Sequence, residues 1–198
     1  MKQESHKGFT LIELLVVIAI VAVLSVVVIL TLNPAELLRQ ARDSNRISDM
    51  ATVRSALSLY LADVLTPVLA TTTAGFGYLH CYATNATGSC AFGFSSGGVT
   101  VYSTSTATSS INGAGWLPVD FTQISSGAPL GNLPVDPVNT SGGNCIYGYM
   151  ATSSNMSFKV VASCMESRKY ARGGSADVVS TDGGSYANVY EVGTNMNL

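Results

Sequence analysis

The sequence predicts an α+β fold, in which a long N-terminal α-helix packs through its C-terminal half on an antiparallel β-sheet head. Three observations lead to this prediction. Residues 14–32 carry no charge and are mostly apolar. Residues 35–64 contain neither Gly nor Pro and repeat apolar side chains at helical spacing. Beyond Leu65, short runs of β-branched and aromatic residues alternate with Gly, Ser and Asn, a pattern typical of strands joined by loops.

The apolar segment is long enough to cross a membrane. As an α-helix, the 24 residues of 9–32 would be about 36 Å long, against roughly 30 Å for the hydrocarbon core of a bilayer. Lys2 and Lys7 precede it and favour a cytoplasmic N-terminus, with the rest of the chain outside. A conventional signal peptide is not indicated, because the small residue Gly8 stands before the apolar core and not after it.

The junction between the polar leader and the apolar run reads KGFTLIELLVVI at residues 7–18. This segment resembles the processing and assembly motif of type IV pilins and pseudopilins, whose pilin-like fold matches the α+β prediction. The resemblance implies cleavage between Gly8 and Phe9 by a prepilin peptidase, and N-methylation of Phe9. It also assigns Glu13 and Phe9 to assembly, since the matching glutamate in pilins is thought to pair with the N-terminal amine of a neighbouring subunit. The alternative is a glutamate lying among lipid headgroups.

Four segments follow. Residues 1–8 are a leader removed by the peptidase, residues 9–33 the transmembrane and filament-core helix, residues 34–65 an amphipathic helix, and residues 66–198 a β-rich head with disulfides. At Asn33-Pro34 two predictions stay open. Either the helix kinks or melts there, or Asn33 caps a second helix that has Pro34 in its first turn.

The amphipathic segment separates apolar and charged side chains. Its apolar face, expected to pack under the sheet, is formed by Met50, Val53, Leu57, Leu61 and Val64. The charged residues on its other faces are Arg39, Arg42, Asp43, Arg46, Asp49 and Arg54. We expect these charges to be solvated, or alternatively to bridge neighbouring subunits in a filament.

Four strands are expected in the head, at residues 99–103, 145–151, 157–165 and 188–193. A hairpin turn centred between residues 154 and 155 would place Tyr149 opposite Val160 and Tyr147 opposite Ala162. The same register places Cys145 opposite Cys164, within reach of a disulfide. A turn centred between residues 85 and 86 would likewise join Cys81 to Cys90. Four cysteines allow three pairings, of which these two local loops are favoured; without a CxxC pair, zinc binding is disfavoured.

Smaller motifs add hypotheses about the head. Leu-Pro-Val-Asp occurs at 117–120 and again at 133–136, which predicts a duplicated turn. Asn85, Asn139 and Asn155 each begin an Asn-x-Ser/Thr pattern and are possible glycosylation sites. Asp177 and Asp182 could supply oxygens to calcium but lack a recognisable ligand spacing, so neither a metal nor a cofactor is expected.

Together these features predict a structural subunit and not an enzyme. The mature chain would keep one histidine, His80, and shows no catalytic motif. The expected function is that of the major pilin of a type IV pilus serving attachment, motility or DNA uptake, with a pseudopilin of a type II secretion-like system or a minor pilin as the alternative. Its expected partners are copies of itself in a helical homopolymer, the prepilin peptidase, the inner-membrane assembly platform and, before assembly, membrane lipid. Nucleic acid stays open, because the head has little basic clustering and the formal net charge is -2. The subunit pool would lie in the cytoplasmic membrane and the filament on the cell surface.

Overall fold

The computed structural model describes residues 8–69, 78–81, 108–139, 145–152 and 155–196, without the side chains of Leu30 and of residues 78–81. The chain forms two units, Met1–Leu38 and Arg39–Leu198. The first unit contains the apolar helix, and the second, called the head here, contains the sheet and the hydrophobic core.

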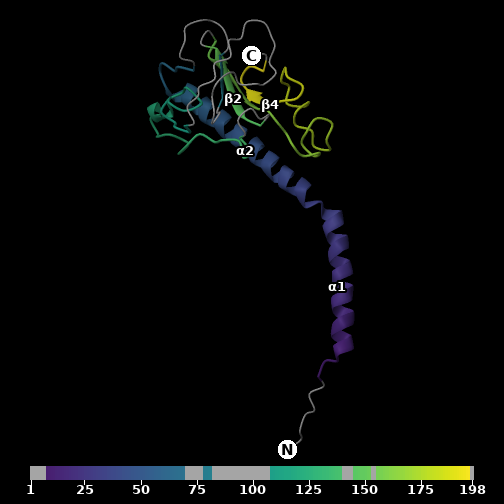
Figure 1. Ribbon diagram of the computed structural model, residues 1–198. Helices are drawn as coiled ribbons and strands as arrows, with labels where there is room; N and C mark the ends of the chain where they lie inside the picture. Colours follow the sequence, from purple (N-terminus) through teal and green to yellow (C-terminus); the bar gives the residue numbers. More distant parts are fainter. Residues whose placement is uncertain (1–7, 70–77, 82–107, 140–144, 153–154, 197–198) are drawn as a thin grey trace, which may run out of the picture. The chain divides into compact units, whose positions relative to one another are not determined.

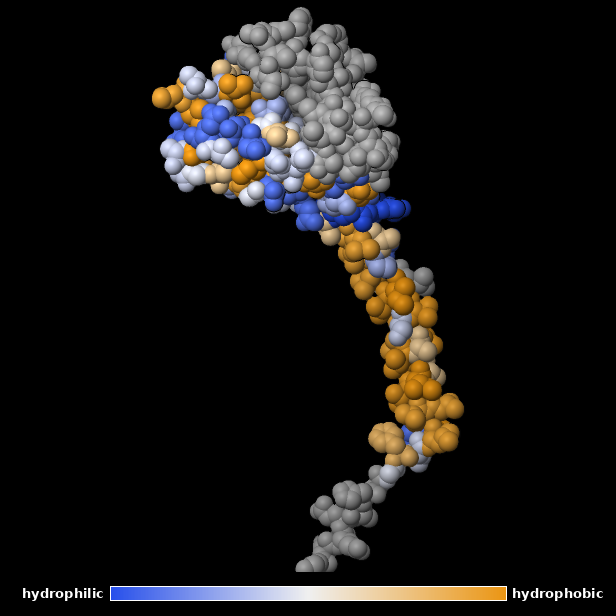
Figure 2. Space-filling view, turned by 60° about the vertical axis from the view of Figure 1, so that its left-hand side comes forward, coloured by the Kyte–Doolittle hydropathy of each residue, from blue (hydrophilic) through white to orange (hydrophobic). Residues whose placement is uncertain are grey.

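Helix α1, Leu11–Leu32, presents apolar side chains in every direction. All its described side chains are exposed, so no described residue of its own unit covers them. Figure 2 shows one face of this helix, which is apolar along most of its length. The two hydroxyl residues in the helix are satisfied locally, since Ser25 Oγ donates to the Val21 carbonyl at 2.7 Å and Thr31 Oγ1 to the Val27 carbonyl at 3.0 Å. The stretch Leu11–Ile29 is long and apolar enough to cross a membrane by length and composition.

The junction at Asn33 combines both predictions made from the sequence. Asn33 adopts a left-handed conformation with φ of 39° and ends α1. Helix α2, Pro34–Asp63, begins at the next residue. The Asn33 carbonyl accepts a hydrogen bond from the Glu36 amide at 2.9 Å, and the Asn33 side-chain oxygen accepts a second from the same amide at 3.4 Å. The helix therefore breaks at Asn33, and Asn33 also caps α2.

A four-stranded antiparallel sheet with the strand order β1-β2-β3-β4 forms the centre of the head. Figure 1 labels two of its strands, β2 and β4. The strands are β1 Tyr78–Cys81, β2 Tyr147–Thr152, β3 Ser157–Ala162 and β4 Tyr190–Gly193. The predicted hairpin register is confirmed, because Tyr149 lies opposite Val160 and Tyr147 opposite Ala162. Strand β1 was missed, and the strand expected at 99–103 lies outside the described residues.

The hydrophobic core lies between α2 and the sheet. The predicted apolar face of α2 is confirmed: Met50, Val53 and Leu57 are fully buried, and Leu61 and Val64 are partly buried against the same cluster. The side chains that meet this face from the sheet alternate along the strands, as expected for one face of a pleated sheet. They are Tyr147, Tyr149 and Ala151 of β2, and Phe158, Val160 and Ala162 of β3.

The repeated Leu-Pro-Val-Asp sequence ends both times in an aspartate-capped turn, but the first copy leads into a short 3₁₀ helix, η1 Phe121–Gln123, and the second into a bend at residues 137–138. Leu117 and Leu133, which begin the two copies, are both in the core. The aspartates that end them both cap the next turn, with Asp120 accepting from the Thr122 amide at 3.0 Å and Asp136 from the Val138 amide at 2.8 Å. Each copy therefore places a leucine in the core and ends in an aspartate whose side chain stabilises the following turn.

The expectation that the charged residues of α2 are all solvated is wrong. Asp43 and Arg46 are fully buried, whereas Arg39 and Arg54 are exposed and Arg42 and Asp49 are half-buried. A buried charge is tolerated only with charged or hydrogen-bonding partners. Other segments of the head supply those partners, as described below.

Candidate functional site

The start of α1 is closed by reciprocal hydrogen bonds between Thr10 and Glu13. The Glu13 amide donates to Thr10 Oγ1 at 3.3 Å, and Glu13 Oε2 accepts from the Thr10 amide at 2.8 Å and from the Thr10 hydroxyl at 2.7 Å. This is a capping box, which satisfies amides at the helix start that otherwise have no partner. The local sequence Thr-x-x-Glu therefore fixes both where α1 begins and where the carboxylate lies.

The residues on both sides of the expected cleavage point are open. Phe9 is 85% exposed, and a methyl group built onto Gly8 would meet no atom within 4 Å. The fold of the chain itself thus gives no reason for a glycine at position 8. A requirement for glycine there would come from whatever enzyme reads the segment.

Glu13 lies on an apolar face of the helix. An open hollow of about 360 Å³ is lined by Glu13 together with Phe9, Ile12, Val16 and Val17. These residues recur at three- and four-residue steps and share one side of the first turns. Glu13 is also the single charged residue in residues 9–32. A carboxylate bordered by exposed apolar side chains is a site at which a cation on an apolar partner could bind.

Cys145 and Cys164 form a disulfide, with their Cα atoms 5.0 Å apart, at the open end of the β2–β3 hairpin. Next to it, the Ile146 amide donates to Ser163 Oγ at 2.7 Å and the Ser163 amide donates to the Ile146 carbonyl at 3.0 Å. The bridge continues the register of the hairpin by one further pair. Cys81 ends β1, and its expected partner Cys90 lies outside the described residues.

The expected glycosylation sites have different surroundings. Asn155 is exposed at the hairpin turn, where its side-chain oxygen accepts hydrogen bonds from the hydroxyls of Thr152 and Ser157. Asn139 is half-buried with φ of 35°, and its side-chain oxygen is buried with no hydrogen-bond partner among the described residues. Asn85 lies outside the described residues.

The two carboxylates considered for calcium are engaged by the chain itself. Asp177 accepts four hydrogen bonds, from the amides of Gly173, Val179 and Ser180 and from the Ser180 hydroxyl, and these donors hold its pKa at about 2. Asp182 accepts from the amides of Gly184 and Glu191. In the part of the chain that the structure describes, no three His, Cys, Asp or Glu side chains gather as a metal site would require.

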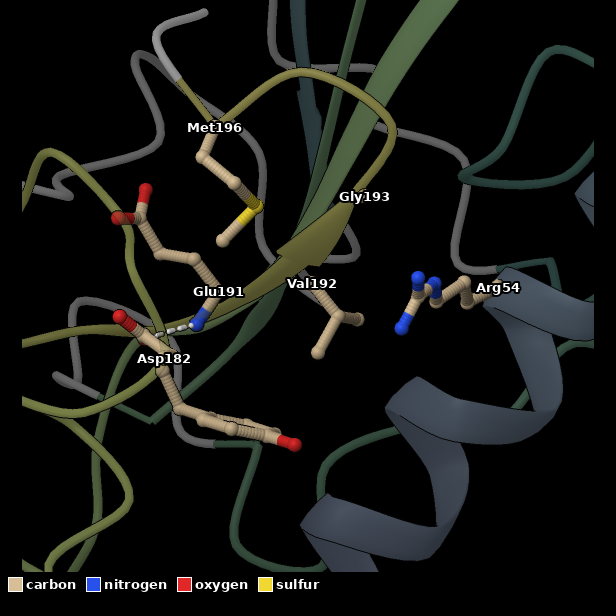
Figure 3. A pocket seen from close by; sticks show the side chains of 7 residues that line it. Arg54, Asp182, Glu191, Val192, Gly193 and Met196 are labelled. Atoms are coloured by element: carbon tan, nitrogen blue, oxygen red, sulfur yellow. Dashed lines mark hydrogen bonds between the residues drawn. The ribbon is translucent and has the colours of Figure 1, made fainter.

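A pocket of about 320 Å³ opens between α2 and β4 (Figure 3). Val192 points from β4 toward Arg54 of α2, and the Glu191 carboxylate points to the other side of the strand. Glu191 forms an ion pair with Lys159 at 2.8 Å, and both side chains are fully buried. Because Asp182 caps the Glu191 amide, the outer edge of β4 is partly closed to pairing with another strand.

Sequence reasoning missed an ionic network, named here the Arg46 network, that joins α2 to two other segments of the head. Arg46 binds Asp136 through Nε at 2.7 Å and Nη2 at 3.0 Å, and its Nη1 binds Asp43 at 2.7 Å and Glu166 at 2.9 Å. Arg42 also binds Glu166, through Nε at 2.7 Å and Nη2 at 3.0 Å. Hydrogen bonds from Arg42, followed by those from Arg46, lower the pKa of Glu166 to about 2 although partial burial opposes the shift.

The Arg46 network also fixes the backbone after the disulfide. Asp43 accepts hydrogen bonds from the amides of Glu166 at 3.0 Å and Ser167 at 2.7 Å. The sequence held one signal for this, namely that Asp43 and Arg46 stand three positions apart on a helix. The sequence held no signal that Asp136 and Glu166 would bind Arg46, because they are 90 and 120 residues away from it.

Comparison with known proteins agrees with the N-terminal geometry. Residues 5–29 match the family model described as the prokaryotic N-terminal methylation motif. The match covers Gly8, Phe9 and Glu13 and supports a prepilin-type signal of the type IV pilin and pseudopilin kind. The matched motif is a structural one and not that of an enzyme family. No curated protein and no solved structure matches the chain.

Proposed function

We propose that this chain is the major structural subunit of a type IV pilus, cut between Gly8 and Phe9 and assembled through α1. One observation carries the proposal: a prepilin-type signal leads directly into an apolar helix whose described side chains are all exposed. Such a surface needs lipid or other helices around it, because water around apolar side chains is unfavourable. A subunit that moves from membrane to filament meets both environments in turn.

Cleavage creates the group that would recognise Glu13. In the precursor the nitrogen of Phe9 belongs to a peptide bond and carries no charge. Hydrolysis of the Gly8–Phe9 bond turns it into an amine, protonated at neutral pH. On α1 of a neighbouring subunit, the Glu13 carboxylate is held by Thr10 alone among the described residues, and apolar side chains border it. Docking the amine there would complete an ion pair in an apolar filament core.

This pairing would give assembly its direction. Exchanging lipid contacts for helix contacts changes apolar burial little, since lipid tails are as apolar as the helix surface. The carboxylate, in contrast, is costly in an apolar setting until a cation reaches it, by about 2.5 to 3.5 kcal/mol at the membrane centre. The axial position that puts the amine of the incoming subunit next to Glu13 of the preceding subunit is therefore favoured over other axial positions.

The proposal includes the remaining steps of the pathway. The precursor waits in the cytoplasmic membrane, a prepilin peptidase cuts it and methylates Phe9, and an assembly platform in the same membrane adds it to a homopolymer that extends from the cell surface. The head then forms the outside of the filament. The disulfide at Cys145 and Cys164 is consistent with a head exported to an oxidising compartment.

The test is to shear filaments from cells that produce the chain, and to measure the intact and N-terminal masses of the dominant filament protein. A dominant subunit that begins at a methylated Phe9 is the expected result. Filaments that lack the chain, with the form beginning at Phe9 left in the membrane, would instead identify a pseudopilin or minor pilin. A chain found only with its leader attached would contradict the cleavage itself.

A further inference from the structure

The cations on the outside of the head come mainly from two stretches of the chain. The sequence holds ten Lys and Arg residues, of which Lys2 and Lys7 precede Phe9, and Arg46 and Lys159 are fully buried. Of the six that remain, all but Arg54 belong either to α2 just after Leu38 or to residues 168–172. These five residues, named here the basic surface, are Arg39, Arg42, Arg168, Lys169 and Arg172.

Direct contacts hold the two halves of the basic surface together. Arg42 binds Glu166, and Asp43 accepts the amides of Glu166 and Ser167. Three residues further on, the side chain of Ser44 of α2 is the largest cause of a lowered pKa of Tyr170, so these two side chains lie close together. The 166–170 segment therefore lies along residues 42–44 of α2. Lys169 Nζ is 4.9 Å from the centre of the Tyr170 ring, which places its ammonium group beside the same part of the helix.

The cations of the loop are presented outward by a well-defined backbone. Arg168, Lys169 and Arg172 are all exposed. The chain behind them is turned by the hydrogen bonds of Asp177, whose negative charge is directed at its own backbone donors. Of the other acids nearby, Asp43 is bound by Arg46, Glu166 is bound by Arg42 and Arg46, and Glu36 precedes Arg39 on α2. The five cations outnumber the three partly exposed acids, Glu36, Glu166 and Asp177, so the net outward charge is positive.

The position of these cations along the chain indicates what they meet. The exposed apolar side chains of the first unit continue beyond α1 to Leu37 and Leu38, which are 52% and 62% exposed, and Arg39 is the next residue. As helix, residues 11–38 are at most about 42 Å long, and a bilayer with its headgroup layers is about 40 to 45 Å thick. A chain that crosses a membrane from Leu11 would therefore bring Arg39 out at the level of the outer headgroups.

We propose that the basic surface binds the phosphates of anionic phospholipid headgroups while the subunit resides in the membrane. The inference rests on the membrane stage of the proposed function. Guanidinium groups bind phosphate oxygens in pairs, and Lys and Arg place long apolar stems along a membrane surface with the charge in the headgroup layer. Clusters of basic residues beside a membrane-spanning helix are attracted to anionic lipids through the surface potential. Nucleic acid is the less favoured phosphate source, because Arg39 directly follows the apolar segment in the chain.

The experiment uses the full-length chain reconstituted in nanodiscs, with hydrogen exchange measured by mass spectrometry. One set of discs contains phosphatidylcholine alone, and the other also contains phosphatidylglycerol. Peptides from residues 166–176 should exchange several-fold more slowly in the anionic discs. About 1 M salt, where the Debye length is about 3 Å, should remove the difference in the unchanged protein. The variant R168Q/K169Q/R172Q should show no difference, whereas R54Q, which removes an exposed cation outside the basic surface, should behave like the unchanged chain.

Hydrogen exchange in peptides from α1 tests separately whether this helix is inserted in the bilayer. If α1 is protected in both kinds of disc but residues 166–176 ignore the lipid charge, the headgroup proposal fails and the membrane stage stands. Unprotected α1 would overturn both. If hydrogen exchange in residues 166–176 is still slowed by anionic lipid after the triple substitution or in 1 M salt, the basic surface does not make the contact with the headgroups. In the last experiment, double-stranded DNA is added to phosphatidylcholine discs. If DNA slows hydrogen exchange in residues 166–176 more than phosphatidylglycerol does, the basic surface is a nucleic-acid site.

Discussion

Glu13 and Arg46 are both charged residues on helices, but their charges are satisfied in different ways. In α1, the Glu13 carboxylate has Thr10, three residues away, as its one bonding partner in the part of the chain that the structure describes, and exposed apolar side chains surround it. In the head, Arg46 is fully buried and meets three carboxylates from three segments. A charge completed within the subunit stabilises the subunit, whereas a charge satisfied only locally on an exposed apolar surface is available to another chain.

The largest expected effect is on assembly, from Glu13→Ala. Filaments should be absent, because the amine of the incoming subunit would lose its partner, whereas cleavage at Gly8 and the unfolding of the head should stay unchanged. The measurement is the yield of sheared filaments, beside the N-terminal mass of the membrane-bound subunit.

A matched variant separates charge from helix capping. Glu13→Gln can keep the hydrogen bonds with Thr10, since glutamine also serves in a capping box, but it removes the charge. It should fail to assemble as Glu13→Ala does. Normal filaments from Glu13→Gln would show that Glu13 acts by starting α1 and not by pairing with an amine.

The next largest effect is on the stability of the head, from Arg46→Ala. This change leaves Asp43 and Asp136 buried without their cation, so the free energy of unfolding should fall by about 3 to 5 kcal/mol. Trp116 is fully buried in the core and is the one tryptophan in the sequence, so its fluorescence can follow urea unfolding of the detergent-solubilised chain. Arg54→Ala is the control, with an expected change within about 0.5 kcal/mol. Equal losses from the two variants would rule out a special role for the Arg46 network.

A somewhat smaller loss is expected from removing the disulfide. In the double variant C145A/C164A, the free energy of unfolding should fall by about 3 kcal/mol, because the unfolded chain is no longer closed into a loop. The same Trp116 signal measures it under oxidising conditions. If adding reductant to the unchanged protein lowers stability but the double variant does not, the stabilising bridge lies elsewhere in the chain.

The smallest expected effect is on pH dependence. The pKa of Glu166 is lowered to about 2 from 4.5, so its contribution to stability is present above about pH 4.5 and is lost as the pH falls toward 2. Glu166→Gln should therefore be less stable than the unchanged chain at pH 7 and nearly equal to it near pH 2. A difference in urea midpoint that stays constant over this range would mean that the charge of Glu166 does not stabilise the head.

Much of the fold could be predicted because its signals are local. The apolar run of α1, the buried face from Met50 to Val64 and the hairpin register between β2 and β3 each depend on spacing within about 20 residues. The capping box at Thr10 and Glu13 is also local, since Thr-x-x-Glu is a start signal for a helix. The candidate assembly site was therefore accessible from the sequence.

The remaining features depend on residues far apart in the chain. Strand β1 pairs with β2 some 70 residues later, and no pattern near Tyr78–Cys81 announces that partner. The position of Arg46 in the sequence of α2 does not distinguish a buried arginine from an exposed one. Only the approach of Asp136 and Glu166 made its burial possible.

The sequence by itself determined where the chain is apolar, where α1 begins and which face of α2 is buried, because hydrophobic periodicity and short-range hydrogen bonds act between near neighbours. Only the tertiary structure decided which charges of α2 entered the interior and which stayed exposed on the basic surface. The physical reason is that a buried arginine is tolerated only once its carboxylates have arrived, and those of Arg46 come mainly from segments 90 and 120 residues away.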